Sequence, residues 1–340
     1  LPADNGAGDQ HDWASTTHLV HLDKVSTEVM LQRATAAYHA GVEDFLLTAL
    51  TLTLARWSGG GSVLVDIDSH GREPLFENVD LTRTVGWFTS VSPHRFSADP
   101  SAPLAASLKS IKEQMRRAPH KGLHYGLLRY LDEGSATATA LKELPQAQVL
   151  FNYMGRLDTS FLGTAFSLLD GEAYGGRDPD WQRPYELSIN ADVFGGRLRM
   201  TWDYSSARYS RETIETLAQS CLVTLKALIQ HCLSPGAGGY TPSDFPLCGL
   251  DQAQIDRLLG SMRGISDVYP MTPLQQGILF HSLYAPRSGV YVEQLSCILE
   301  GKLDTAAFKD AWRLVVLAHP ILRTAFVWEG AARPLQVVHD

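Results

Sequence analysis

Residues 62–73 read Ser-Val-Leu-Val-Asp-Ile-Asp-Ser-His-Gly-Arg-Glu, a strand-like run that ends in a charged turn. Apolar and polar side chains alternate along it, and successive side chains of a strand point to opposite faces of a sheet. The alternation therefore predicts a strand over 62–68, with Asp66 and Asp68 on one face and an apolar opposite face. If that end of the strand faces a cleft, partial burial would raise the pKa of a carboxyl group there. Asp68 is thus a candidate acid–base residue, and a solvated aspartate at a strand end is the alternative.

A second strand-like run, Ala147 to Met154, carries Asn152 and Tyr153 after the apolar Val149-Leu150-Phe151. Neighbouring residues of a strand face opposite sides, so one of the two is expected to face a cleft and the other the packed interior. Tyr153 is therefore either a proton-handling phenol or a core tyrosine whose hydroxyl bonds locally.

The rest of the first 232 residues alternates between segments with the two-residue period of a strand and segments with the 3.6-residue period of a helix. Strands are expected at 16–22, 85–88, 161–169, 185–194 and 197–204, and helices at 26–39, 43–57, 102–117, 125–131 and 211–232. The helix at 43–57 is apolar nearly all round, which predicts burial on several sides. Gly59-Gly60-Gly61 precedes a strand and lacks Gly-Lys-Ser/Thr, so it indicates a turn and not a phosphate-binding loop. Strands interleaved with helices predict an α/β fold.

A change of composition divides the chain. Residues 233–246 contain three Pro and three Gly, which disfavours both a helix and a central strand. We therefore predict a first unit over 1–233, a linker over 234–264 and a second unit over 265–340. In the linker a short helix is expected at 251–259, and in the second unit a helix ending near 283, strands at 290–299 and 322–328, and a helix at 304–318. That unit is too short to be the whole of the domain that it begins.

Composition excludes several classes of protein. The net charge of −8 and the lack of Lys/Arg clusters argue against a nucleic-acid partner. The longest apolar run, 45–55, is far short of the ~20 residues that span a bilayer, so no membrane association is expected. The four cysteines show no Cys-x-x-Cys spacing, which indicates free thiols in a reducing cytoplasm, and His18 and His21 make a poor metal pair, so no metal site is expected. The chain begins without Met and has no signal-peptide pattern, which indicates a piece of a longer protein.

Four stretches of the first unit resemble signatures of the epimerization domain of nonribosomal peptide synthetases. They are Asp68-Ser-His-Gly-Arg-Glu73, Arg83-Thr-Val-Gly-Trp-Phe-Thr89, Tyr125-Gly-Leu-Leu-Arg-Tyr130 and Phe151-Asn-Tyr-Met-Gly155. Residues 15–232 are similar to the C-terminal lobe of that domain. Residues 265–340 resemble the start of a condensation domain, through Tyr269-Pro-Met-Thr-Pro-Leu-Gln-Gln-Gly277 and His319-Pro-Ile-Leu-Arg-Thr-Ala-Phe326. The Thr-Pro-Leu-Gln-Gln-Gly form is similar to condensation domains that follow an epimerase.

The resemblance implies a fold and an activity. The fold is a pair of chloramphenicol-acetyltransferase-like lobes, mixed sheets packed with helices, with the active site in a tunnel between them. The activity is inversion of the α-carbon of an L-aminoacyl or peptidyl thioester on the phosphopantetheine arm of a peptidyl carrier protein, with no cofactor of the domain's own. The implied partners are that carrier, the N-terminal lobe of the epimerization domain and the remainder of the condensation domain.

The resemblance also assigns residues. Asp68, in a position that is usually Glu in the family, and Tyr153 are implied as catalytic, with Asn152 beside them. His70, Arg72 and Glu73 are implied as supporting residues that brace the turn, and Trp87 as tunnel wall or core. The acid–base histidine of the family lies in His-His-x-x-x-Asp on the other lobe, and no two of the twelve histidines here are adjacent. The chain by itself is therefore expected to be inactive.

Two alternatives remain open at the level of sequence. One is an amide-forming, condensation-type lobe of the same fold. The other is a non-catalytic lobe that only docks a carrier protein.

Overall fold

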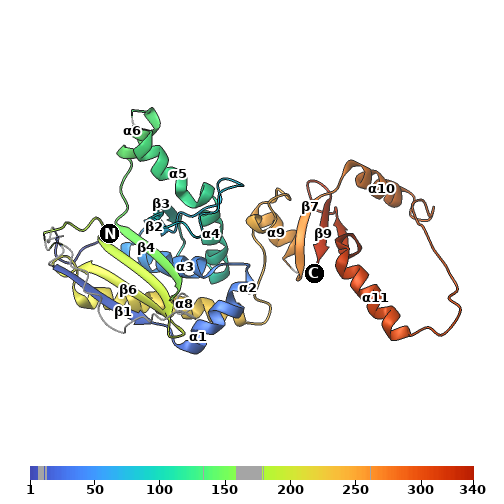
Figure 1. Ribbon diagram of the computed structural model, residues 1–340, viewed down its shortest axis with the longest axis horizontal. Coiled ribbons are helices and arrows are strands. Elements are labelled where there is room, and N and C mark those ends of the chain that lie inside the picture. Colours follow the sequence, from blue (N-terminus) through green and yellow to red (C-terminus); the bar gives the residue numbers. More distant parts are fainter. Residues whose placement is uncertain (7–10, 12–13, 133, 158–177, 179, 261) are drawn as a thin grey trace. The chain divides into compact units, whose positions relative to one another are not determined.

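The computed structural model describes residues 1–6, 11, 14–132, 134–157, 178, 180–260 and 262–340. The chain divides into two compact units, Leu1–Gly238 and Gly239–Asp340 (Figure 1). The division falls inside the segment rich in Pro and Gly. No helix among the described residues is long and apolar enough to cross a membrane.

The first unit is built on a six-stranded mixed sheet in the order β1-β6-β5-β4-β2-β3. The strands are β1 (Ser15–His21), β2 (Ser62–Ser69), β3 (Ser90–Ser97), β4 (Val149–Arg156), β5 (Leu187–Phe194) and β6 (Arg197–Ser205). The pairs β2–β4 and β4–β5 are parallel and the other pairs are antiparallel. The carboxyl ends of β2 and β4 therefore lie side by side, which brings the two motif-bearing strands together.

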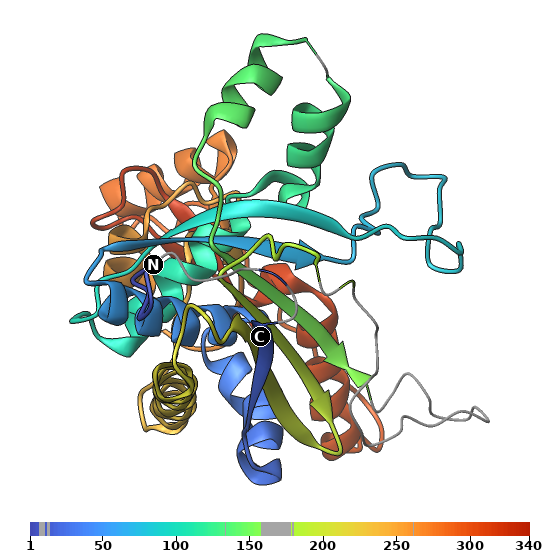
Figure 2. The ribbon, with the colours of Figure 1, turned by 90° about the vertical axis from the view of Figure 1, so that its left-hand side faces the viewer.

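Helices pack on one face of this sheet. They are α1 (Lys24–Val29), which continues through a π-helical turn (Met30–Ala34) into α2 (Thr35–Ala37), then α3 (Val42–Ser58), α4 (Leu104–Arg116) and α8 (Arg211–Leu233). Helix α6 (Ala136–Glu143) instead projects away from the sheet (Figure 1). Between α4 and α6 lie a 3-10 turn (Pro119–Gly122), α5 (Leu123–Gly126) and a π-helical turn (Leu127–Leu131). Every residue of α3 from Asp44 to Ala55 is buried, as its all-round apolar sequence predicts. Figures 1 and 2 show α3 and α8 against the same side of the sheet, where they form the core with Phe96, Phe151 and Trp202.

The opposite face of the sheet carries no packed helix over β1, β6, β5 and β4 in the described part of the first unit, whereas the α5 region walls a cavity over β2 and β3. Side chains on this face alternate with the buried ones along each strand, and Leu19, Val91 and Met154 among them are substantially exposed. We call this the open face. It carries the carboxylates of β2.

The structure corrects the expected strand at 85–88. Those residues form no strand, and Val85 and Trp87 are 99% and 89% exposed. The strand is β3, five residues further on. Its Pro93 and charged neighbours conceal it in the sequence, and the proline is tolerated because β3 is an edge strand. The segment between β2 and β3 is a long loop that projects beyond the strand ends (Figure 2).

Three further elements differ from expectation or fall outside it. The expected strand at 290–299 is irregular, since no strand pairs with it in the described residues. Helix α6 is not predicted from the sequence, because its Ala- and Thr-rich residues carry a weak apolar stripe. The strand expected at 161–169 lies outside the described residues.

The second unit has a three-stranded sheet in the order β7-β9-β8, made of β7 (Ile265–Pro270), β8 (Thr324–Val327) and β9 (Leu335–His339). Its helices are α9 (Gln252–Leu259), α10 (Pro273–Tyr284) and α11 (Thr305–Ala318), with 3-10 turns at Pro242–Asp244 and Pro320–Arg323. Its core includes Tyr240, Phe245 and Ile255, and the Tyr240 hydroxyl accepts a hydrogen bond from the backbone N–H of Ile265 at 2.9 Å. Residues 240–259, expected to be linker, thus contribute to the core of this unit.

Asp44 closes the start of α3, and its loss is expected to destabilise the chain. Its carboxylate accepts the Gly41 N–H at 2.7 Å and hydrogen bonds from the Arg116 guanidinium at 3.0 and 3.1 Å. Asp44 is buried, so Asp44→Ala removes the hydrogen-bond acceptor of the Arg116 guanidinium and of the Gly41 N–H. The loss is expected to lower the free energy of unfolding by about 3 kcal/mol. Denaturant unfolding of the full chain measures this. Asp80→Ala is the control. It removes an exposed carboxylate that accepts hydrogen bonds from the N–H and side chain of Thr82, and it should leave the unfolding midpoint unchanged. An equal loss in both variants would contradict the assignment.

Candidate functional site

Asp68 and Asn152 lie side by side at the carboxyl ends of two parallel strands. In the register of β2 and β4, Asp68 is the partner of Asn152 and Asp66 is the partner of Leu150. The buried residues of β2 are Val63, Val65 and Ile67, so Asp66 and Asp68 share the open face, as the alternation predicts. The structure thus joins the two sequence motifs through Asp68 and Asn152.

A row of polar side chains continues from Asn152 across the open face. The Asn152 amide donates to Asn190 Oδ1 at 3.3 Å, and the Asn190 amide donates to Asp203 Oδ2 at 3.4 Å. Thr17 closes the row by donating to Asp203 Oδ1 at 2.7 Å. Because a carboxylate only accepts, Asp203 fixes the direction of both amides. Asn152 therefore donates away from Asp68 and keeps its own Oδ1 as an acceptor.

The Asp68 carboxyl group is half-buried and makes no hydrogen bond within the described part of the chain. Burial raises the pKa of this carboxyl group above its ordinary value. Desolvation is the only cause, since no cation and no donor offsets it. A carboxylate in this state is a stronger base than a solvated one, which suits it to accept a proton.

The turn after Asp68 is held by backbone contacts. Gly71 adopts φ +63°, and a Cβ there would lie 1.7 Å from the carbonyl oxygen of Phe88. The Arg72 guanidinium donates to the carbonyl oxygens of Leu81 and Gly86 and lies 4.3 Å from the centroid of the Phe88 ring. These contacts tie the start of the loop to its end.

His70 and Glu73 also serve this turn. His70 Nδ1 accepts the Arg72 N–H at 3.0 Å, and Glu73 Oε1 lies 3.5 Å from His70 Nε2 and 3.0 Å from Lys121 Nζ. The His70 side chain is largely exposed. The geometry favours a bracing role for His70, Arg72 and Glu73 over direct chemistry.

Tyr153 and Trp87 are not brought to Asp68. Tyr153 packs against the core on the side of Phe151, the helix-covered face, and burial raises the pKa of its phenol. Asp68 and Tyr153, both implied as catalytic by the resemblance, therefore lie on opposite faces of the sheet, because adjacent positions of β4 point to opposite faces. Trp87 is not a core residue, since it is exposed on the loop.

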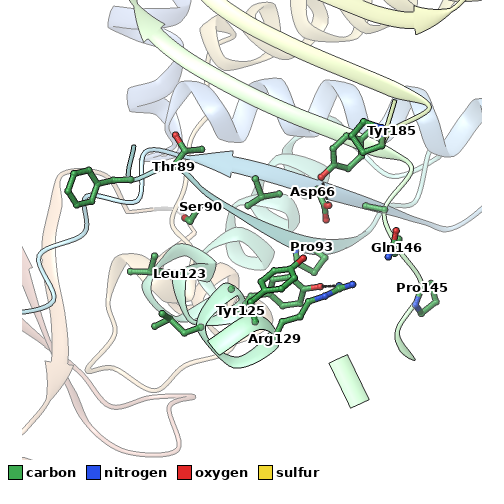
Figure 3. A pocket seen from close by; sticks show the side chains of 17 residues that line it. Asp66, Thr89, Ser90, Pro93, Leu123, Tyr125, Arg129, Pro145, Gln146 and Tyr185 are labelled. Atoms are coloured by element: carbon green, nitrogen blue, oxygen red, sulfur yellow. Dashed lines mark hydrogen bonds between the residues drawn. The ribbon is translucent and has the colours of Figure 1, made fainter. Parts of the chain in front are cut away.

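A cavity of about 530 Å³ lies at Asp66, two residues before Asp68 on the same face of β2, and sequence reasoning assigned no site to it (Figure 3). Asp66, Pro93 and Val91 line it from the sheet, and Tyr125, Arg129 and Tyr130 line it from α5 and the following turn. The Tyr185 hydroxyl donates to Asp66 Oδ2 at 2.8 Å. Burial raises the pKa of Asp66, although the bond from Tyr185 opposes this. The signal available in the sequence was the motif at 125–130, which carried the resemblance but no role.

No group of three or more His, Cys, Asp or Glu side chains among the described residues could hold a metal ion.

Comparison with known proteins identifies the family. The model of the condensation domain family matches residues 1–245 and 265–340. The chain belongs to this family of nonribosomal peptide synthetase domains.

Two curated relatives are components of the linear gramicidin synthase of Brevibacillus parabrevis. One is 44% identical over 94% of this chain, and the other is 41% identical over 100% of it. The chain spans only 4% and 7% of the lengths of these two proteins.

The solved structure of the epimerization domain from the third module of tyrocidine synthetase B is also similar. It has a TM-score of 0.62 and 33% identity, over 68% of this chain and 52% of that one. The condensation domain of the Monacolin K polyketide synthase shares the fold with a TM-score of 0.51 and 19% identity, over 68% of this chain and 50% of that one. These matches confirm the predicted fold class, a mixed sheet packed with helices as in chloramphenicol-acetyltransferase-like lobes.

Proposed function

We propose that residues 1–233 are the C-terminal lobe of an epimerization domain, and that residues 265–340 begin a condensation domain of the same synthetase. The two separate matches to one family model support this division. The likeness to the tyrocidine epimerization domain supports the assignment of the first lobe. The observation that carries the activity is the position of Asp68, half-buried and without a hydrogen bond among the described residues, beside Asn152 on the open face.

In the proposed reaction, Asp68 takes the α-proton of an aminoacyl or peptidyl thioester. The C–H bond breaks, its electron pair passes into the thioester carbonyl as an enolate, and Asp68 becomes the neutral acid. Return of a proton to the opposite face of the carbon, from a group of the N-terminal lobe, yields the D form. Asp68 then gives its proton to solvent and the donor takes one from solvent, which restores both groups. The reaction needs no oxidant and no cofactor of the domain itself.

Asp68 and the proton donor must face each other across a channel, so the partner lobe faces the open face in this proposal. The substrate is carried on the phosphopantetheine arm of a peptidyl carrier protein. Arg72, His70 and Glu73 hold the turn, and Asn152, fixed by the polar row, is positioned to contact the substrate.

The test is exchange of the substrate α-hydrogen with deuterated solvent, measured by mass spectrometry on a carrier-bound aminoacyl or peptidyl thioester. A protein that carries this sequence together with its N-terminal lobe is expected to exchange the hydrogen and to accumulate the D form. This chain alone is expected to do neither. Exchange by the chain alone would contradict the division of the site between two lobes.

The family match keeps one second function in view, which is amide formation by a condensation-type lobe. The two differ in what they do to one substrate. Peptide-bond formation by the two-lobed protein without α-exchange would replace the proposal, and α-exchange without an acceptor amine would support it.

Variants of Asn152 and Tyr153 distinguish two assignments of the site, one in which the Asn152 amide acts beside Asp68 and one in which the Tyr153 phenol does. Asn152→Ala is expected to lower α-exchange by about tenfold or more, because the amide neighbours Asp68 on the open face. Tyr153→Phe keeps the ring that packs against the core and removes only the hydroxyl, and it is expected to have the smaller effect. Initial rates of exchange measure both. A larger loss of exchange rate in Tyr153→Phe than in Asn152→Ala would mean that the phenol acts on the substrate, and it would contradict the assignment of Tyr153 to the core-facing side.

A further inference from the structure

The polar row beside Asp68 has one direction. Asn152 donates to Asn190 Oδ1 at 3.3 Å, and Asn190 donates in turn to Asp203 Oδ2 at 3.4 Å. Each amide has a donating end and an accepting end, whereas a carboxylate only accepts. Asp203 therefore sets the direction of the row, and Asn152 is the last amide that it orients.

The order of the strands decides which end of the Asn152 amide lies toward Asp68. β4 lies between β5 and β2, and Asn152 is the register partner of Asn190 on β5 and of Asp68 on β2. Because Nδ2 of Asn152 is directed at Asn190, its Oδ1 lies on the side of Asp68. No hydrogen bond joins Asn152 to Asp68 in the part of the chain that the structure describes, as expected for two acceptors that face each other.

This arrangement acts on the protonation of Asp68. A hydrogen-bond donor stabilises a carboxylate, and an acceptor for the O–H stabilises the neutral acid. Asp68 is denied the donor of its neighbour and has the acceptor of that neighbour beside it. Burial of the Asp68 carboxyl group raises its pKa in the same direction.

The other groups around Asp68 do not donate to it. On its own strand the next side chain of the open face is Asp66, which has the same sign of charge and receives the Tyr185 proton at 2.8 Å. Burial raises the pKa of the Tyr185 phenol, and the charges of Asp66 and Asp68 raise it further. The partner on β3 is the apolar Val91, and Arg129 faces Asp66 across the cavity from the turn after α5.

We propose that Asn190 and Asp203 are positioning residues for the base. They hold Asn152 with its donor turned away from Asp68, and they place Asn152 Oδ1 to accept a hydrogen bond from the O–H that Asp68 acquires with the substrate proton. This rests on the proposed epimerization at Asp68. The row transfers no proton itself; it keeps Asp68 a stronger base before the transfer and stabilises the neutral acid after it.

Asp203→Asn removes the group that sets the direction of the row. An amide at this position can donate to Asn190 Oδ1, after which Asn190 donates to Asn152 and Asn152 donates to Asp68. The pKa of Asp68 is then expected to fall by about one pH unit, the effect of roughly one charge-assisted hydrogen bond. A ¹³C-carboxyl NMR titration of this chain measures the fall, with Asp68→Asn to assign the signal.

The double variant Asn190→Asp/Asp203→Asn exchanges the amide and the carboxylate within the row. Asn152 then donates again to a carboxylate on β5, so the pKa of Asp68 is expected to return to its value in the unaltered chain or above it. Asn190→Ala releases the Asn152 donor without changing any charge, and it is expected to lower the pKa of Asp68 as Asp203→Asn does. It decides the question if thermal unfolding shows that Asp203→Asn does not fold.

Asp192→Asn is the control for the loss of one negative charge. Asp192 lies on β5, one strand closer to Asp68 than Asp203 is, and its carboxylate is bonded to Arg199 and not to the row. Neighbouring strands are about 4.8 Å apart, so a long-range effect of charge would be larger in this variant than in Asp203→Asn. Asp192→Asn is expected to leave the pKa of Asp68 unchanged.

The consequence for catalysis is measured by α-exchange with the two-lobed protein. In Asp203→Asn the acidic limb of kcat/KM should move to lower pH by about one unit, and the rate above the limb should fall by about threefold to tenfold, since the base is weaker. An equal fall of the Asp68 pKa in Asp192→Asn, no fall in Asp203→Asn and Asn190→Ala, or no recovery in the double variant overturns the positioning role. Absence of exchange by the unaltered two-lobed protein overturns epimerization itself, and the NMR titration of this chain still decides the role of the row.

Discussion

Asp68→Asn in the two-lobed protein is expected to abolish most α-hydrogen exchange, with a loss on the order of a hundredfold to ten-thousandfold. The amide keeps the shape of the side chain but cannot take a proton. Asp66 is not expected to replace it, because it lies two residues away along the strand, about 7 Å, and accepts a hydrogen bond from Tyr185, while the neighbouring Asn152 is an amide. Exchange measured in deuterated buffer, with the carrier-bound peptidyl thioester, gives the rate.

Two further variants serve as comparisons for Asp68→Asn. Asp203→Asn changes a carboxylate on the same face at the far end of the polar row, and it is expected to cost far less than Asp68→Asn. Asp68→Glu lengthens the side chain by one methylene to the residue usual in the family, and because a shift of ~1 Å can change a rate on the order of a hundredfold, it is expected to change the rate measurably. Equal rates in Asp68→Asn and the unaltered protein would leave only a docking role for the lobe.

The pH profile follows from the same carboxyl group. The reactive form is the carboxylate, so exchange should fall as the pH drops through the pKa of Asp68. Burial raises that pKa, so the fall should begin at a higher pH than the ordinary aspartate pKa of 3.8 would give. Asp68→Asn is expected to remove this acidic limb from whatever exchange remains.

Local patterning was sufficient to predict the strands that carry the site. The alternation in β2 places Asp66 and Asp68 on one face whatever the rest of the chain does. The apolar run of β4 predicts the strand but leaves open whether Asn152 or Tyr153 shares that face. The parallel register that puts Asp68 beside Asn152 is not local, because it depends on which strands pair across about eighty residues. The motif resemblance implied Asp68, Tyr153 and Asn152 together, and the register places Asn152 directly beside Asp68.

The elements that sequence reasoning missed depend on context. Val85 and Trp87 have high strand propensity, yet they lie on a loop because no strand is available among the described residues to pair with them. β3 contains a proline and is a strand only because it lies at the edge of the sheet, where a missing N–H is tolerated. The cavity at Asp66 brings together residues from five segments, β2, β3, the α5 region, 145–147 and 184–185, and no spacing in the sequence encodes it.

Position 71, between the site and the loop, has room only for glycine, which carries a hydrogen atom in place of a Cβ. A Cβ at this residue would lie 1.7 Å from the Phe88 carbonyl oxygen and 2.8 Å from its carbon, both backbone atoms that no side-chain rotation can move. Gly71→Ala must therefore displace the Phe88 end of the loop or the strand end that carries Asp68. Exchange is expected to fall on the order of a hundredfold, the usual consequence of a ~1 Å misplacement, while the core beneath α3 and α8 stays folded.

Gly59→Ala provides the matched control, since the two glycines differ in surroundings but not in backbone conformation. Gly59 has φ +66° at the end of α3, and a Cβ there would meet nothing within 4 Å. Both variants bear the strain of a left-handed conformation, about 1 kcal/mol, so their difference isolates the clash. Limited proteolysis of residues 72–89 together with α-exchange measures it: Gly71→Ala should be cleaved faster and exchange slowly, whereas Gly59→Ala should lose stability alone. Because the Arg72 contacts to Leu81 and Gly86 hold the loop only if Gly71 can approach Phe88, equal behaviour of the two variants would mean that the loop does not position Asp68.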